Sequence, residues 1–427
     1  MANLKCNFLG TELKNPIGVS SCDYGGEVEK AKRVIDQGIG WLTAKTCHKI
    51  DGPHRWPRPH FYSLKKFGTG LQDAWVCSQM FHNMPYDEFL EKEGPALVKL
   101  CKDNDVMFIG SVCGIGEDPE SWIPLCKDME ALGCAAVELD TGGPHATFGA
   151  IAEHADVGAP LAMNPEKAYR IAKECVEAVN IPILYKMTPQ CVEQAKVTMA
   201  VHRAGCHGIT ANNAFYGAWI DQETATFYGG PYAVGGLMGR PWQLFSLAKF
   251  LESTATVKGM PAIGVGGVFT WDDVVRYMMA GAHVVGFCSS LYSRGVQVLG
   301  EAIKGLEEFM DRKGYKSVDE FKGCVVDDFG YVRDWPREKI MAKVSPIIPK
   351  FDYDLCNSCG MCEKLCPYGC ITMKDNKPVS SDHCTGCGWC MGHCPAKEGT
   401  IVMVRRDNGK VVWNGRGVHE AWAKDEK

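Results

Sequence analysis

Two short cysteine runs near the C-terminus constrain this 427-residue chain more than any other feature. The first run has the spacing C-x2-C-x2-C-x3-C-P and comprises Cys356, Cys359, Cys362 and Cys366. The second run repeats that spacing and comprises Cys384, Cys387, Cys390 and Cys394. Two-residue gaps let three thiolates of one run converge on one inorganic cluster, while the fourth cysteine reaches the other cluster. The repeat therefore predicts a small domain built around two metal–sulfur centres.

We expect each centre to be a [4Fe-4S] cluster. One is assigned to Cys356, Cys359, Cys362 and Cys394, and the other to Cys384, Cys387, Cys390 and Cys366. Zinc is the alternative, because C-x2-C pairs also bind it, but two complete runs favour clusters. Nine of the 22 cysteines fall in this segment, and Cys370 is left as a spare. In a reducing compartment such clustering indicates metal or redox chemistry more often than disulfides.

The first 312 residues alternate short apolar runs with amphipathic helical stretches, which is typical of buried parallel strands joined by helices. Eight such units in about 300 residues predict a (β/α)8 barrel of the α/β class. The alternative is an open doubly wound sheet. The expected strands are Pro16–Ser21, Trp41–Thr46, Val106–Cys113, Ala135–Asp140, Pro182–Met187, His207–Asn212, Pro261–Val265 and His283–Phe287.

Two long insertions and a change of texture divide the chain further. Residues 47–105 separate the second and third strands, and residues 213–240 follow the sixth strand with many aromatic side chains. We expect these loops either to border the site or merely to pack down on the barrel. The expected domains are a barrel at 1–312, a proline-punctuated connector at 313–350, a ferredoxin-type domain at 351–402 and a tail at 403–427.

Composition excludes several classes of function. The net charge is −5, so no broad basic surface argues for binding to nucleic acid or to anionic membranes. No uncharged apolar run approaches the roughly 18 residues of a membrane span, and the N-terminus lacks the apolar core of a signal peptide. We therefore expect a cytoplasmic protein.

The seventh and eighth strands end in segments suited to a phosphate. Gly266 and Gly267 close the seventh strand, and Cys288 and Ser289 close the eighth, each before a helix. Loops after these two strands, with exposed amides at a helix N-terminus, form the usual phosphate site of a barrel.

Two lysines point to a flavin at the same end of the barrel. Lys45 ends the second strand and Lys186 ends the fifth. A lysine buried at an apolar strand end needs an anionic partner, which the N1–C2=O edge of a reduced flavin would supply. The alternative is that each lysine reaches solvent.

With these motifs together, the chain resembles the flavin barrel of the dihydroorotate dehydrogenase and dihydropyrimidine dehydrogenase family, fused to a bacterial-type 2[4Fe-4S] ferredoxin domain of the α+β class. The motifs Asn15–Ser21, Ala44–Thr46, Tyr185–Pro189 and Thr210–Asn213 carry the resemblance. It implies FMN as a cofactor and Asn213 as a substrate contact. The implied FMN contacts are Ser20, Ser21, Lys45, Thr46, Lys186, Asn212, Gly235, Gly236, Val265, Gly266, Gly267, Cys288 and Ser289.

The substrate half of the site departs from that family. Its fourth strand reads Asn-x-x-Cys-Pro, where the cysteine is the general acid/base, but here Asp140 and Gly143 replace the asparagine and the cysteine. The family's Asn-x-Glu clamp becomes Cys77-x-Gln79, which makes Cys77 and Gln79 expected substrate contacts, and the threonine after the sixth-strand asparagine becomes Ala214. These changes put uracil, thymine and dihydroorotate in doubt as substrates.

Proton chemistry remains open to other residues on the same loops. We expect Asp140 and His145, five residues apart, to be catalytic. His145 would otherwise be an exposed loop histidine, and Asp140 would otherwise cap a helix or bond within its loop. Cys77 is a further candidate for the place of the missing thiol.

The leading hypothesis is an iron–sulfur flavoprotein oxidoreductase that passes electrons between the clusters and FMN. It would reduce a polarised C=C bond of a small cyclic substrate, or run in reverse. The alternatives are an electron-transfer subunit without its own substrate, a dihydropyrimidine dehydrogenase with an acid other than cysteine, and a redox-sensing binding protein. Because no strand–G-x-G-x-x-G–helix unit is present, we expect a separate FAD/NAD(P)H subunit, or ferredoxin or flavodoxin, as electron partner, and a homo-oligomer.

Overall fold

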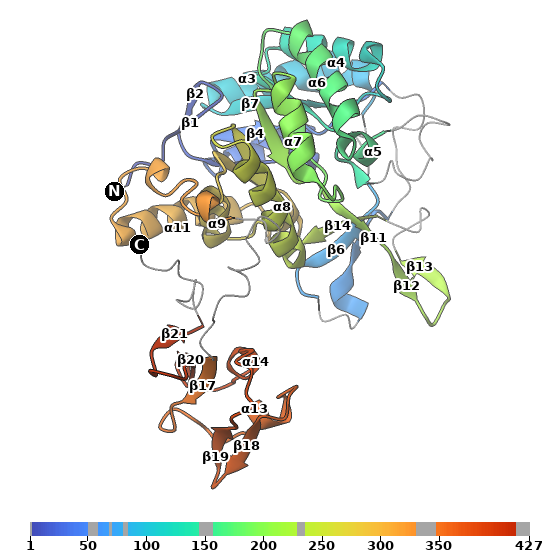
Figure 1. The fold of residues 1–427 in the computed structure, drawn as a ribbon. Coiled ribbons are helices and arrows are strands. Elements are labelled where there is room, and N and C mark those ends of the chain that lie inside the picture. The colour runs from blue at the N-terminus through green and yellow to red at the C-terminus, as the bar shows by residue number, and fades with distance from the viewer. Residues whose placement is uncertain are drawn as a thin grey trace. The chain divides into compact units, whose positions relative to one another are not determined.

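Eight short strands close into a parallel barrel, in the order β3-β4-β7-β8-β9-β10-β15-β16 (Figure 1). Every residue of these strands is buried, because their side chains fill the barrel or face the surrounding helices. The barrel confirms the (β/α)8 prediction over the open sheet. The strands are β3 (Ile17–Val19), β4 (Trp41–Thr43), β7 (Met107–Val112), β8 (Ala136–Leu139), β9 (Ile183–Lys186), β10 (Gly208–Ala211), β15 (Ala262–Val265) and β16 (Val284–Phe287).

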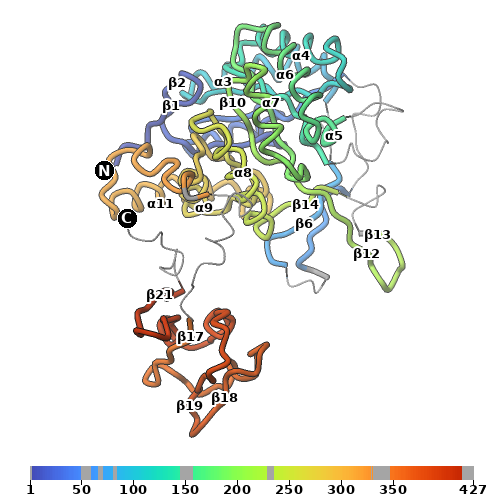
Figure 2. Tube along the Cα trace, viewed as in Figure 1, coloured from blue at the N-terminus to red at the C-terminus, as the bar shows by residue number. Residues whose placement is uncertain are grey.

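In the computed structural model the chain divides into two units, Met1–Phe329 and Gly330–Lys427 (Figure 2). The structure describes residues 2–49, 59–67, 71–79, 84–144, 157–228, 235–329 and 347–415. The division falls inside the connector expected at 313–350. The short helical turns at Val318–Glu320 and Val326–Asp328 belong to the first unit. The four domain bounds expected from the sequence remain predictions.

A helix follows each barrel strand and lies on the outside of the barrel (Figure 1). Local signals set the helix ends: in α4, Asp118 caps the first turn and Gly133, with φ of 90°, ends the last. The helices are α1 (Val28–Ile35), α3 (Gly94–Asp103), α4 (Pro119–Leu132), α6 (Pro165–Ala178), α7 (Gln194–Arg203), α8 (Gln243–Thr256), α9 (Trp271–Met279) and α11 (Val298–Lys313). Shorter helices are α2 (Tyr86–Glu88), α5 (Ala159–Ala162) and α10 (Ser289–Arg294), and Phe89–Glu93 forms a π-helical turn.

The two long insertions combine into one antiparallel sheet with the order β11-β14-β6-β5. Strands β5 (Phe61–Ser63) and β6 (Ala74–Cys77) come from the first insertion, and β11 (Phe215–Gly217) and β14 (Gly235–Gly239) from the second. A hairpin of β12 (Trp219–Asp221) and β13 (Thr226–Tyr228) extends from the same region (Figure 2). A further hairpin, β1 (Cys6–Phe8) and β2 (Thr11–Leu13), precedes the barrel and buries Phe8.

The second unit is small and strand-rich. Strands β17 (Ile347–Phe351), β20 (Ile401–Arg405) and β21 (Val411–Trp413) form one sheet, and β18 (Ile371–Lys374) with β19 (Lys377–Ser380) form a hairpin. Two one-turn helices, α13 (Met361–Lys364) and α14 (Trp389–Gly392), follow a left-handed glycine each. Both cysteine runs lie within this unit, as the sequence predicts.

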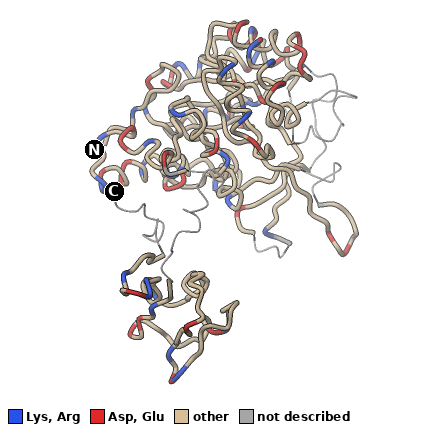
Figure 3. Tube along the Cα trace, viewed as in Figure 1, with Lys and Arg blue, Asp and Glu red and all other residues tan. Residues whose placement is uncertain are grey.

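Charged residues of both signs occur in the described parts of both units. Basic and acidic residues are interspersed along both units (Figure 3). Within the described ranges, no helix combines the length and the apolarity that crossing a membrane requires.

Candidate active site

A cavity of about 430 Å³ opens at the carboxyl ends of the barrel strands. Its lining includes residues that follow seven of the eight barrel strands, together with β6 and β14 of the inserted sheet. Most residues expected at the site line it: Ser20, Ser21, Lys45, Thr46, Cys77, Gln79, Asp140, Lys186, Asn212, Asn213, Gly236, Val265, Gly266, Gly267, Cys288 and Ser289. This is the end of a barrel at which active sites form, and the volume suits a small cofactor or ligand.

Three buried charges lie together at the ends of β8 and β9. Lys186 Nζ donates to Glu138 Oε1 at 3.1 Å and to Asp140 Oδ2 at 3.3 Å. Burial alone would lower the pKa of Lys186, but the two carboxylates raise it overall, so the ammonium stays charged. The expectation that Lys186 needs a flavin as its anionic partner is therefore wrong, because two protein carboxylates already fill that role.

Asp140 is the acceptor for two further donors. Thr46 Oγ1 donates to Asp140 Oδ2 at 2.7 Å, and Asn213 Nδ2 donates to Asp140 Oδ1 at 3.0 Å. The Thr46 hydroxyl also contacts Ser21 Oγ at 3.0 Å, and Asn213 Oδ1 accepts from the Ala214 amide at 2.7 Å. The donors to Asp140 thus come from the ends of β4, β9 and β10 and not from its own loop, and the side-chain amide of Asn213 already donates to Asp140.

A second polar group surrounds Asp23, which follows β3. Gln79 Nε2 donates to Asp23 Oδ1 at 2.8 Å, and the Tyr292 hydroxyl donates to Asp23 Oδ2 at 3.2 Å. Burial alone would raise the pKa of Asp23, but the charge of Lys45 and these bonds lower it overall. The Gln79 amide is therefore committed to Asp23.

Three thiols line the cavity. Burial raises the pKa of Cys77 to about 11, so this thiol keeps its proton near neutral pH. Cys22 and Cys288 follow the neighbouring strands β3 and β16, and a hydrogen bond from Cys288 lowers the pKa of Cys22 despite its burial. Sequence reasoning missed Cys22, whose only signal is its place directly after the Ser20-Ser21 motif.

The residues that follow β15 and β3 fit a bound flavin. Gly266 has φ of 122°, and a Cβ there would lie 2.3 Å from Ser246 Oγ, so only glycine lets the backbone approach the cavity. Ser20 Oγ is buried and has no partner among the described residues, which leaves it for a bound ligand.

One premise about the phosphate site is corrected. The first turn of α9 is closed by a capping box between Thr270 and Asp273, and Asp273 Oδ2 accepts from the Phe269 amide at 2.9 Å. These amides are not free for a phosphate. Cys288 before α10 makes no such side-chain cap, so Ser289 and the Gly266-Gly267 turn remain for that role.

Three of the expected positions differ from the rest. A Cβ on Gly143 would meet no atom of the described residues within 4 Å, so none of them fills the place of the family's cysteine. Gly235 does not line the cavity, and its lack of a side chain is explained by Val76 Cγ1, 2.5 Å from a Cβ placed there. His145 lies outside the described residues.

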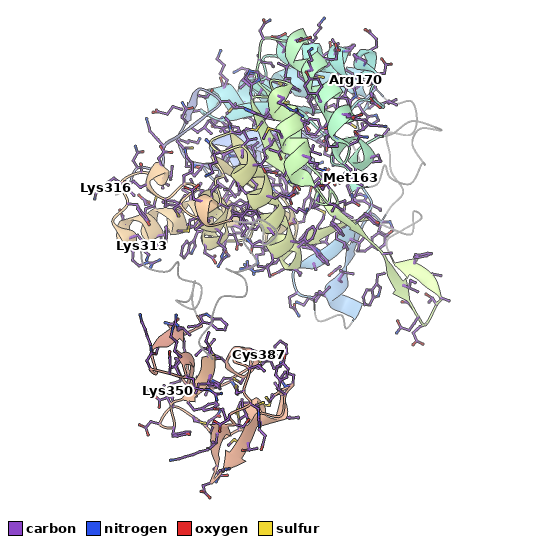
Figure 4. All side chains as sticks on the ribbon, viewed as in Figure 1. Met163, Arg170, Lys313, Lys316, Lys350 and Cys387 are labelled. Carbon is purple, nitrogen blue, oxygen red and sulfur yellow. The ribbon has the colours of Figure 1, made fainter. Side chains whose placement is uncertain are left out.

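Each predicted cysteine set surrounds its own hollow in the second unit. Cys356, Cys359, Cys362 and Cys394 line one hollow, and Cys366, Cys384, Cys387 and Cys390 line the other, together with Cys370. Cys387 is exposed (Figure 4). In the described part of the chain, no three Cys, His, Asp or Glu side chains gather around a single ion site. An all-cysteine donor set spread around a hollow fits a cubane, and the fourth cysteine of each run crosses to the other set.

Two family models match the chain. The model described as "Dihydroorotate dehydrogenase" covers residues 3–310, and the model described as "4Fe-4S binding domain" covers residues 349–372. These matches coincide with the barrel and with the first cysteine run.

Curated relatives cover most of the chain at modest identity. The NAD-dependent dihydropyrimidine dehydrogenase subunit PreA of Escherichia coli is 25% identical over 391 residues, which are 90% of this chain and 90% of that protein. The catalytic subunit of dihydroorotate dehydrogenase B (NAD(+)) from Methanocaldococcus jannaschii is 29% identical over 309 residues, 72% of this chain and 93% of that protein. Its counterpart from Pyrococcus furiosus is 28% identical over 329 residues, 75% and 98% of the two chains.

Proposed function

The chain belongs to the dihydroorotate dehydrogenase family, and from this premise we propose that it reduces a polarised C=C bond of a small cyclic substrate, or oxidises the corresponding CH–CH bond, by FMN and two [4Fe-4S] clusters. When bound, FMN would supply hydride chemistry and the clusters would supply single-electron transfer. One observation carries the proposal: the residues that match the family's FMN motifs converge from separate strand ends on one cavity.

The cavity's own residues support a substrate other than a pyrimidine. Beside the charged groups, its lining is rich in apolar side chains, among them Phe61, Phe215, Met238, Trp242 and Phe245. The amides of Gln79 and Asn213 are already bonded to Asp23 and Asp140. A pyrimidine ring carries several polar N–H and C=O groups, which these two amides could bind only by giving up their present hydrogen bonds. A largely apolar ring or enone therefore suits the cavity better.

The proton for the reduced carbon has three candidate sources on this chain. Asp140 accepts three hydrogen bonds and so is held as an acceptor, which suits binding and orientation better than proton donation. His145 remains a proposed acid on sequence grounds. Cys77 lines the cavity as a protonated thiol, and it is the donor that its surroundings support best.

We propose that electrons pass between this chain and a separate redox protein, either a flavin–NAD(P)H subunit or a ferredoxin or flavodoxin. The relatives from E. coli and M. jannaschii are themselves named as subunits. The direction of the reaction and the oligomeric state belong to the same proposal.

The test uses the full chain purified without oxygen. We expect about one FMN on denaturation and about eight iron and eight sulfide per chain. After reduction with dithionite, the flavin should be reoxidised rapidly when the protein is mixed with a cyclic enone. Mixing with uracil or dihydroorotate should reoxidise it far more slowly. A protein that holds FMN and clusters but is reoxidised by no cyclic alkene would instead favour the electron-transfer subunit without its own substrate.

A further inference from the structure

The buried charges beside the cavity do not balance. Lys186 is one cation, and it bonds to two carboxylates, Glu138 and Asp140. The three side chains are 7%, 1% and 9% exposed for Lys186, Glu138 and Asp140 respectively, so water screens them little. With the lysine protonated and both carboxylates ionised, the group carries one net negative charge.

Each carboxylate is fixed in place by a neighbouring hydroxyl. Ser111 Oγ donates to Glu138 Oε1 at 3.0 Å, and Thr46 Oγ1 donates to Asp140 Oδ2 at 2.7 Å. Lys186 therefore lies between two fixed carboxylates, and these two groups, not a ligand, neutralise its charge. Asp140 and Lys186 line the cavity while Glu138 does not, so Asp140 is the carboxylate that faces a bound ligand.

A charge of this kind acts on any redox group in the same cavity. Reduction of a flavin adds negative charge, and a negative charge in a poorly screened environment opposes that addition. Lys186 opposed only by Glu138 would form a neutral pair. Asp140 supplies the excess charge, and an asparagine in its place would keep an oxygen for Thr46 without that charge.

We infer that Asp140, the carboxylate in excess over the single charge of Lys186, lowers the reduction potential of the FMN held in this cavity, an inference that rests on the proposed function. Asp140 is in this role a positioning residue that acts through Lys186 and through its own charge. A flavin of lower potential gives up its hydride more readily, which suits the reduction of a C=C bond.

The experiment compares the flavin potential of the holoprotein with that of Asp140→Asn, by anaerobic equilibration with a reference dye. We expect the reduced-to-oxidised ratio at a fixed potential to rise at least tenfold in the variant, which is a positive shift of about 30 mV for a two-electron couple. Lys186→Met leaves both carboxylates without their cation, so its potential should shift in the negative direction. A merely structural role of these residues would not shift the flavin potential in opposite directions in the two variants.

The matched control is Glu252→Gln. Glu252 is a buried carboxylate 2.9 Å from Lys249, but neither residue lines the cavity, so the potential should stay as in the parent protein. FMN retained in Asp140→Asn with an unchanged potential overturns the inference. Where that variant does not retain FMN, Glu138→Gln, which removes one negative charge from the same lysine, must show the positive shift. Absence of FMN from the parent protein would instead contradict the proposed function.

Discussion

Cys77 on β6 is paired directly with Gly236 on β14, so their side-chain positions lie on the same face of the inserted sheet. A Cβ on Gly236 would lie 3.1 Å from Ala214 Cβ and 3.5 Å from Pro144 Cγ. Because Gly236 has no side chain, nothing on this residue fills the space beside Ala214 and Pro144. Cys77, from the first insertion, and the Gly143-Pro144 loop, from which the family's thiol is missing, line the same cavity.

If Cys77 is the proton donor, Cys77→Ala should slow substrate reduction about 10²- to 10⁴-fold, the usual contribution of a general acid. Reduction of the flavin by dithionite should be unchanged, because no proton is delivered to substrate in that step. Rapid mixing of pre-reduced protein with substrate separates the two steps. The control is Cys126→Ala, since Cys126 is a buried thiol on α4 outside the cavity. Equal rates for Cys77→Ala and the parent would assign the proton to another group, with His145→Ala as the next variant to test.

Gly143→Cys should be tolerated and should restore the family's acid. A Cβ at this position meets no atom of the described residues within 4 Å, so the side chain clashes with none of them. We expect feeble uracil reduction by the parent protein and a rise in the variant of up to about 10²-fold, since the acid returns but the Asn-x-Glu clamp does not. Steady-state assays with uracil and an artificial donor measure it. Efficient uracil reduction by the parent protein would overturn the substrate argument.

The barrel was predictable because its signal is local. Buried parallel strands read as short apolar runs, and each of the eight runs expected from the sequence contains one barrel strand. The cysteine sets were predictable for the same reason, because ligand spacing is written within one short segment. His145 could be proposed from its neighbourhood in the sequence, but it lies outside the described residues.

The inserted sheet and the charge balance were not predictable in this way. Strands β6 and β14 lie about 160 residues apart in the sequence and have only a few residues each, so the sequence of neither strand indicates which strand it pairs with. The sequence analysis assigned a flavin as the partner of Lys186 and did not include Glu138. The sequence signal for Glu138 is that it is the single acidic residue inside the apolar run Ala135–Leu139, where an unpaired charge would be costly.

His283 should make the stability of the first unit depend on pH. Burial lowers its pKa to about 4, and its Nδ1 accepts from the Ala262 amide, which needs the neutral ring. Well above pH 6.5 the ring is neutral in both states and this contribution is complete. As the pH falls from about 7 to 5, the unfolded chain takes up a proton that the folded chain refuses, so the free energy of unfolding should fall by about 2 kcal/mol.

Urea unfolding at pH 7 and pH 5, followed by far-ultraviolet circular dichroism, measures this effect as a difference between parent and variant. His283→Asn keeps an acceptor near the Ala262 amide but does not titrate, so its stability should change less between the two pH values. The same loss of stability in both proteins would show that other groups carry the acid sensitivity.

The fourth cysteine of each run lines the hollow of the other run. Cys366 belongs to the first run but lines the hollow of the second, and Cys394 belongs to the second run but lines the hollow of the first. Cys366→Ser should therefore damage the cluster held by Cys384, Cys387 and Cys390, and Cys394→Ser should damage the other cluster.

Electron paramagnetic resonance of the reduced proteins, with iron counts, tells the two clusters apart. We expect each variant to lose about half of its iron and a different signal in each case. Cys370→Ser is the matched control, because Cys370 lines the second hollow while its thiol donates to the Tyr368 carbonyl at 3.4 Å, and it should keep both clusters. Loss of the same signal from Cys366→Ser and Cys362→Ser would mean that each run holds its own cluster. That outcome would contradict the crossed arrangement, in which Cys362 and Cys366 line different hollows.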